Sequence, residues 1–167
     1  PEPVPGDPDL EALFPTQING EAFTVQTTNG SELKSDPQVD PTFVSDLEGA
    51  LATLGAQIED LSLGFAATGS GEDGVAVTAI RLAGGEGTAL QDAVLPMLLS
   101  FGDLQEVPLA YGGKDVTIVT DGPVDGDPAA SPVPGGQVRF YTYANGEVLW
   151  VVQGTEPWLT AAISALP

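Results

Sequence analysis

The chain has 167 residues with 24 acidic and four basic side chains, a formal net charge of −20, and neither histidine nor cysteine. This charge repels nucleic-acid phosphates and anionic lipid headgroups, so the composition disfavours binding to nucleic acid or to a membrane surface. The lack of histidine and cysteine excludes Ser-His-Asp catalysis, Cys-His catalysis and Cys/His zinc sites, and we therefore expect a protein that is not an enzyme.

The first eight residues, PEPVPGDP, contain four prolines and two acidic residues. This composition is typical of an extended stalk, and it predicts residues 1–8 as a tether and residues 9–167 as a single domain. A proline-rich stalk before a compact domain indicates an extracytoplasmic location, either secreted or tethered to the cell surface. No run of about 18 apolar residues occurs, so no transmembrane segment is expected.

The first half of the chain alternates predicted helices and strands. Asp7-Pro8 or Asp9 caps a short helix, and residues 21–28 form a first strand. Asp40-Pro41 begins a longer helix, whose inward residues are Phe43, Leu47, Leu51 and Leu54. Alternation then predicts a second strand with Leu61, Leu63, Phe65 and Ala67 on one side. After the turn at 69–74 comes a third strand at 75–83. A helix from Thr88 follows, with Leu90, Val94, Leu98 and Phe101 inward.

The last third of the chain is rich in predicted strands. Gly112-Gly113 joins strands at 106–111 and 114–120, and Asn145-Gly146 joins strands at 137–144 and 147–153. The intervening segment 121–136 is predicted as a loop because of its prolines and glycines. A final helix begins at Thr155-Glu156-Pro157.

Residues 21–111 follow the order strand-helix-strand-strand-helix-strand. This is the split βαββαβ order of ferredoxin-like folds. We therefore predict an α+β fold with a mainly antiparallel sheet and helices on one face. In this prediction the C-terminal hairpins and the terminal helix extend the ferredoxin-like core.

The last hairpin contains the candidate binding residues. A turn at Asn145-Gly146 places Tyr141 opposite Trp150. Tyr143 and Arg139 fall on the same side of the hairpin. An open aromatic face with one cation could dock a protein partner, an apolar ligand or a sugar.

The alternative is that the final helix or the long loop packs over these rings. On the opposite side of the hairpin, we expect Phe140 to face the helices and to be more buried than Trp150.

The loop TDGPVDGDP offers a candidate metal site at Asp121, Asp125 and Asp127. Carboxylate oxygens on a loop suit Ca²⁺, the only cofactor that the sequence suggests, although the EF-hand pattern is not met. The alternative is a solvated acidic loop. Carboxylate pairs such as Glu59-Asp60 and Glu72-Asp73 could serve a hydrolase without histidine, but no pattern singles out a cleft.

Four segments carry a resemblance to a known group of proteins: LEALFP, GGKDVTIVTD, YTYANGEVLWVVQG and the terminal ALP. With them the chain resembles uncharacterised bacterial exported domains of lipoprotein type. The resemblance implies one extracytoplasmic domain, and it transfers no activity and no site residues.

We therefore expect a non-enzymatic, extracytoplasmic binding or accessory domain, tethered through its N-terminus, as in an accessory subunit of a cell-envelope assembly. Its charge suits a basic protein or a divalent cation as partner. The alternatives are a calcium-stabilised structural or adhesion module and a carboxylate-dependent hydrolase.

Overall fold

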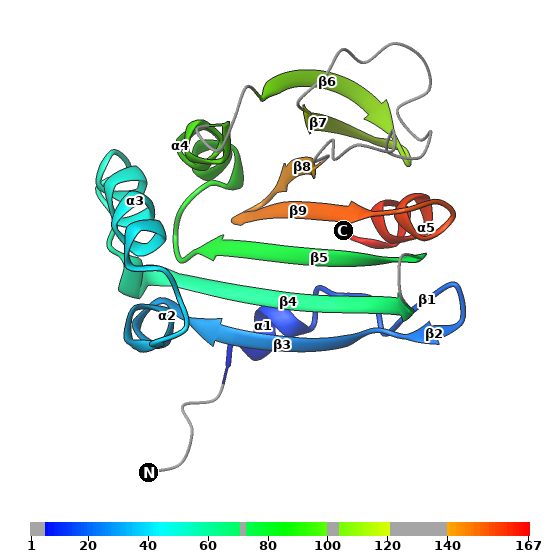
Figure 1. Cartoon of the computed structure of the whole chain (residues 1–167), viewed down its shortest axis with the longest axis horizontal. Coiled ribbons are helices and arrows are strands. Elements are labelled where there is room, and N and C mark those ends of the chain that lie inside the picture. The colour runs from blue at the N-terminus through cyan, green and yellow to red at the C-terminus, as the bar shows by residue number, and fades with distance from the viewer. Residues whose placement is uncertain (1–5, 71–72, 100–103, 121–139) are drawn as a thin grey trace.

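The computed structural model describes residues 6–70, 73–99, 104–120 and 140–167 (Figure 1). The strands of its main sheet are β3 (Thr24–Asn29), β4 (Leu61–Ser70), β5 (Asp73–Leu82), β6 (Gln105–Tyr111), β7 (Lys114–Thr120), β8 (Phe140–Asn145) and β9 (Val148–Gly154). Within the described ranges they form one antiparallel sheet in the order β3-β4-β5-β9-β8-β7-β6. A small ribbon pairs β1 (Gln17–Ile18) with β2 (Glu21–Ala22).

The helices are α1 (Pro8–Glu11), α2 (Gly30–Ser35), α3 (Pro41–Ala52), α4 (Gly87–Leu99) and α5 (Trp158–Ala165), and Ile58–Asp60 forms a 3₁₀ turn. Asp40 caps α3 through its carboxylate, as the sequence predicts, and Asp7, one of the two caps predicted for the first helix, caps α1; a proline follows each of them. None of the helices in the described ranges has the length and hydropathy needed to cross a bilayer. Phe101, predicted to lie inward, is outside these ranges.

The N-terminal boundary of the domain lies earlier than expected. Asp7 is the N-cap of α1 and Pro8 is its first residue, so residues that were assigned to the stalk belong to the folded part. The cause is local, because the Asp7 carboxylate accepts hydrogen bonds from the N–H groups of Asp9 and Leu10. Residues 1–5 lie outside the described residues.

The predicted α+β class with a mainly antiparallel sheet is confirmed, but helices cover both faces of the sheet instead of one (Figure 1). One apolar cluster joins the sheet to α1 and α5, and a second joins it to α3 and α4. The sequence signal for two covered faces is the run VLWVV in β9, in which the residues on both sides of the strand are apolar. Strands buried on both sides have such continuous apolar runs.

The strand order also differs from the predicted split βαββαβ core. In a split βαβ unit, the two strands that a helix connects are parallel and have another strand between them. Here β3 and β4, which α2 and α3 connect, are adjacent and antiparallel. The central strand β5 pairs with β9, about 75 residues later in the chain, and no local sequence pattern indicates that pairing.

The register of the β8–β9 hairpin is shifted from the predicted one. Tyr143 lies opposite Trp150, Tyr141 lies opposite Val152, and Gly146 and Glu147 form the turn. The shift amounts to two residues. Because side chains alternate with a period of two, an even shift leaves every side chain on its predicted side of the sheet.

Candidate functional site

The aromatic residues predicted as a docking surface are buried. Tyr141 and Tyr143 on β8 and Trp150 on β9 are only 2%, 4% and 0% exposed. They lie in the cluster that α1 and α5 cover, and the ring of Phe14 meets the Trp150 ring edge-on at 5.1 Å between centroids. The prediction of an open aromatic face is therefore wrong. Arg139, the fourth predicted binding residue, lies outside the described residues.

The predicted contrast with Phe140 is also wrong. Phe140 is half-buried whereas Trp150 is fully buried. The reason is that both faces carry helices, and the face with α1 and α5 is the more completely covered around the hairpin.

Two polar atoms in this aromatic cluster have no hydrogen-bond partner among the described residues, namely the Tyr143 hydroxyl oxygen and Trp150 Nε1. Their rings are stacked with an interplanar angle of 18° and centroids 6.3 Å apart. Burial raises the pKa of the Tyr143 hydroxyl far above its usual value, because the charged form has no solvent around it. Lys114 Nζ lies 5.7 Å from the Tyr143 ring centroid and donates to the Ile163 carbonyl at 2.7 Å.

The opposite face of the sheet is covered by helices at one end only. There α3 and α4 lie over the start of β4, the end of β5 and the start of β9. Inward positions of a strand are about 6.6 Å apart and a helix is about 10 Å wide, so one helix covers about two of them. Beyond that end, no helix of the described ranges lies over the same face of these strands (Figure 1).

We call the uncovered part the open sheet face. The strand register places its residues in two rows across β3, β4, β5 and β9. The row nearer to α3 is Gln26, Phe65, Thr78 and Val151, and the outer row is Thr24, Ala67, Ala76 and Gln153. Phe65 is 54% exposed and Leu13, on the chain after α1, is 39% exposed; these are the two large hydrophobic side chains that stand out to solvent in the described ranges.

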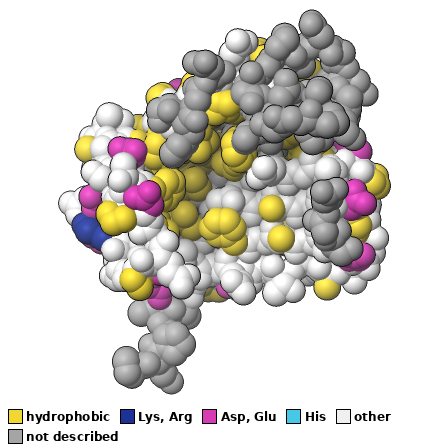
Figure 2. Space-filling view, in the orientation of Figure 1, with side chains coloured by type: hydrophobic (Ala, Val, Ile, Leu, Met, Phe, Trp, Pro, Cys, Tyr) yellow, Lys and Arg dark blue, Asp and Glu magenta, His cyan; other side chains and the backbone are white. Residues whose placement is uncertain are grey.

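The open sheet face contains no ionisable side chain, although the chain carries 24 acidic residues. Figure 2 shows hydrophobic side chains gathered beside α3 and over the middle of the sheet, with Asp and Glu side chains at the margins. Four of its eight side chains are apolar and the other four are uncharged threonine and glutamine. An exposed aromatic side chain on a surface without charge is typical of interaction sites. The open sheet face is therefore the candidate functional site.

Sequence reasoning placed Phe65 on the same side of its strand as Leu61 and Leu63, and the structure confirms this. Alternation in β4 identifies which residues share a face, and it contains no information on how far a helix extends over them. The available signal was the absence of charge at alternate positions of β3, β4, β5 and β9 in an otherwise acidic chain.

The cations of the described ranges are all engaged in local contacts. Lys34 Nζ pairs with Glu48 at 2.6 Å and with Glu59 at 3.7 Å on the surface, and these carboxylates raise the pKa of Lys34. Lys114 donates to a carbonyl at the end of α5. Arg81, on β5, is held between two carboxylates.

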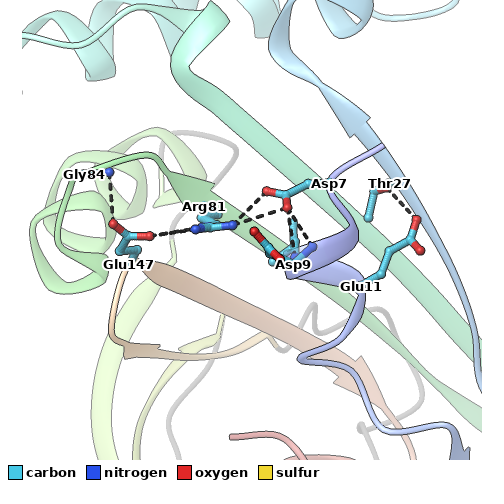
Figure 3. Close-up of polar contacts among 8 residues, drawn as sticks. Asp7, Asp9, Glu11, Thr27, Arg81, Gly84 and Glu147 are labelled. Carbon is cyan, nitrogen blue, oxygen red and sulfur yellow. Dashed lines mark hydrogen bonds and ion pairs between the residues drawn. The ribbon is translucent and has the colours of Figure 1, made fainter. Parts of the chain in front are cut away.

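The Arg81 guanidinium joins three parts of the chain (Figure 3). It pairs with Asp7 at 3.1 Å and with Glu147 at 3.1 Å, and the second Glu147 oxygen accepts the Gly84 N–H at 3.0 Å. Partial burial raises the pKa of Asp7, but the Leu10 N–H, Ser62 and Arg81 together outweigh it and hold this pKa below its usual range. The contacts fasten the start of α1 to β5 and to the β8–β9 turn, on the face opposite the open sheet face.

The predicted calcium ligands Asp121, Asp125 and Asp127 lie outside the described residues. Within the described residues, no three carboxylates gather in a group that could hold a metal ion.

Comparisons with protein-family models, curated proteins and solved structures give no significant match. They lend no support to the resemblance to exported lipoprotein-type domains, and the extracytoplasmic location stays a prediction.

Proposed function

We propose that the chain is a non-enzymatic binding or accessory domain and that a protein partner docks on its open sheet face. The observation that carries the proposal is Phe65, 54% exposed on a sheet surface without charged side chains. Centres of protein interfaces are depleted of charged residues and enriched in aromatic ones. A protruding aromatic side chain among short uncharged ones is the arrangement that a central binding hot spot requires.

The composition supports the non-enzymatic part of this proposal. The chain has no histidine and no cysteine, so it lacks the side chains that most often act as general base and as strong nucleophile near neutral pH. Three of the four prolines of the predicted stalk precede α1, and this composition supports an extended tether. We propose that the tether holds the domain outside the cytoplasm. Accessibility of the protein to added protease in intact cells tests this location, and full protection would contradict it.

Site-specific photo-crosslinking tests the docking surface. A benzophenone amino acid at position 65 keeps an aromatic side chain there, and the same amino acid at position 13 is the matched control. In cells that naturally make the chain, we expect position 65 to capture a defined protein and position 13 to capture none. Equal capture from both positions, or none from position 65, contradicts the proposal.

The variant Phe65→Ser supplies the competition arm of this experiment. Because more than half of the side chain is already in solvent, the substitution should lower the free energy of unfolding by about 1 kcal/mol or less. Unlabelled wild-type protein should then compete with the crosslink, and unlabelled Phe65→Ser protein should not.

A further inference from the structure

We propose that the element that docks on the open sheet face is a cationic amphipathic helix of a partner protein, an inference that rests on the proposed function. Three properties of the surface support it: the vacancy in the layer of helices, the distance across the exposed strands, and the sign of the surrounding charge.

The helix layer on this side of the sheet is incomplete. α3 and α4 cover one end of this sheet face. Val151 is half-buried at the boundary between their apolar cluster and the open sheet face. The apolar part of a sheet face is normally buried by a packed layer of helix or sheet, and here that layer ends before the row of Phe65 and Thr78. A helix placed beside α3 would continue the existing layer and cover Phe65 and Thr78, which lie opposite each other in the register.

The dimensions suit a helix of ordinary length. Four strands, β3, β4, β5 and β9, carry the open sheet face, and their outer members are about 14 Å apart at a spacing of about 4.8 Å. A helix of about 12 residues is about 18 Å long and crosses all four strands. Its apolar stripe, at every third or fourth residue, would meet the uncharged rows, and its polar side would face outward.

The negative charge of the chain favours a helix that carries positive charge. The chain has a net charge of −20, and the described cations are engaged in contacts within the chain. Asp46 on α3 and Asp92 on α4, the helices beside the vacancy, are exposed and form no ion pair within the described residues. A second copy of the chain would bring a further charge of −20 and be repelled. A helix with Lys or Arg along the edges of its apolar stripe would be attracted and steered.

Three synthetic helical peptides of 14 residues test the inference on the full chain. They share one leucine stripe and differ in having lysine, glutamine or glutamate at the polar positions. We expect the lysine peptide to bind with an affinity that falls as the salt concentration rises. The glutamine peptide should bind at least about ten-fold more weakly than the lysine peptide, and the glutamate peptide should not bind. Amide shifts of Thr78 and Val151 in NMR spectra should report the contact.

Two variants show whether binding occurs at the proposed place. Phe65→Ser should weaken the lysine peptide about ten-fold or more, because it removes the central aromatic contact, and the matched exposed substitution Leu13→Ser should leave the affinity unchanged. If both variants weaken binding of the lysine peptide equally, or if neither weakens it, the peptide is attracted to the acidic surface as a whole. Either result would overturn the inference.

Two further outcomes separate this inference from the proposed function. A glutamine peptide that binds as tightly as the lysine peptide, still dependent on Phe65, overturns the cationic helix and leaves the docking surface in place. Sedimentation that shows a dimer of the chain, abolished by Phe65→Ser, overturns it in favour of a second copy.

Discussion

Tyr143 and Trp150 bring two polar atoms into the apolar core without hydrogen-bond partners among the described residues. An unsatisfied buried polar group costs about 1–3 kcal/mol. Burying an aromatic ring removes about 150–250 Å² from water, worth about 4–6 kcal/mol at about 25 cal/mol per Å². Burial of each ring therefore outweighs the lost hydrogen bond, which explains why the core accepts both side chains.

Trp150→Ala should lower the free energy of unfolding by about 3–5 kcal/mol, because it leaves a cavity against Phe14 and Tyr143. Urea unfolding at neutral pH measures the change. Phe140→Ala, at a half-buried position of the same hairpin, should cost less. A loss below about 1 kcal/mol at Trp150 would mean that its ring is not enclosed.

Tyr143→Phe tests what the buried Tyr143 hydroxyl costs the folded protein. Burial raises the pKa of Tyr143, while an unfolded tyrosine titrates near pH 10. Below about pH 10 both states hold the proton. Above it the unfolded state loses the proton first, so Tyr143 makes the domain less stable as pH rises, by up to about 1.4 kcal/mol per pH unit.

The phenylalanine variant lacks this proton and the unpaired hydroxyl. It should match or exceed the wild-type protein in stability at pH 8, and its advantage should grow above about pH 10. Urea midpoints at the two pH values measure the difference. An advantage that stays constant with pH would show that the hydroxyl already ionises in the folded protein.

At the scale of elements, the sequence predicted what local patterns encode. The cap at Asp40, the alternation in β4, and the shared side of Tyr141 and Trp150 were predicted correctly, and Asp7 was one of the two caps offered for the first helix. Each of these depends on residues within one or two turns or strands of one another. The fold class followed from their order along the chain.

The pairing of β5 with β9 and the extent of the helix layer were not predictable in this way. Many strand orders satisfy the same alternation, and the correct one depends on contacts between distant segments. The candidate site depends on the same information. Phe65 was visible as an apolar strand residue, but its exposure follows from where α3 and α4 end.

Asp7→Asn tests how strongly α1 is fastened to the sheet. At neutral pH we expect a loss of about 1–2 kcal/mol, because asparagine still caps the helix but has no charge for Arg81. The pKa of Asp7 is lowered in the folded state, so its stabilisation is present above the unfolded value of about 3.9 and disappears as pH falls through the folded value.

Wild-type and Asp7→Asn proteins should therefore differ in urea unfolding at pH 7 and converge at about pH 2–3. Asp9→Asn, in the same helix and exposed, is the control that should change little at either pH. A difference that persists undiminished at low pH would locate the effect in packing instead of charge.

At the scale of the whole molecule, one sheet is shared by two apolar clusters while the surface carries a large negative charge. Salt acts on two opposing effects. It weakens the surface pairs of Lys34, which solvent already screens, and it relieves repulsion among 24 carboxylates. Repulsion acts among many groups and attraction among few, so relief of repulsion is the larger effect.

The melting temperature should therefore rise when ionic strength increases from about 0.01 M to about 0.15 M, as the screening length falls from about 30 Å to about 8 Å. Sodium chloride and choline chloride at equal ionic strength should give the same rise, because screening does not depend on the cation. A double variant Asp46→Lys/Asp92→Lys, with a net charge four units less negative, should show a smaller rise. A flat or falling melting temperature would contradict repulsion as the dominant effect. A rise specific to calcium at constant ionic strength would instead favour the calcium-stabilised alternative.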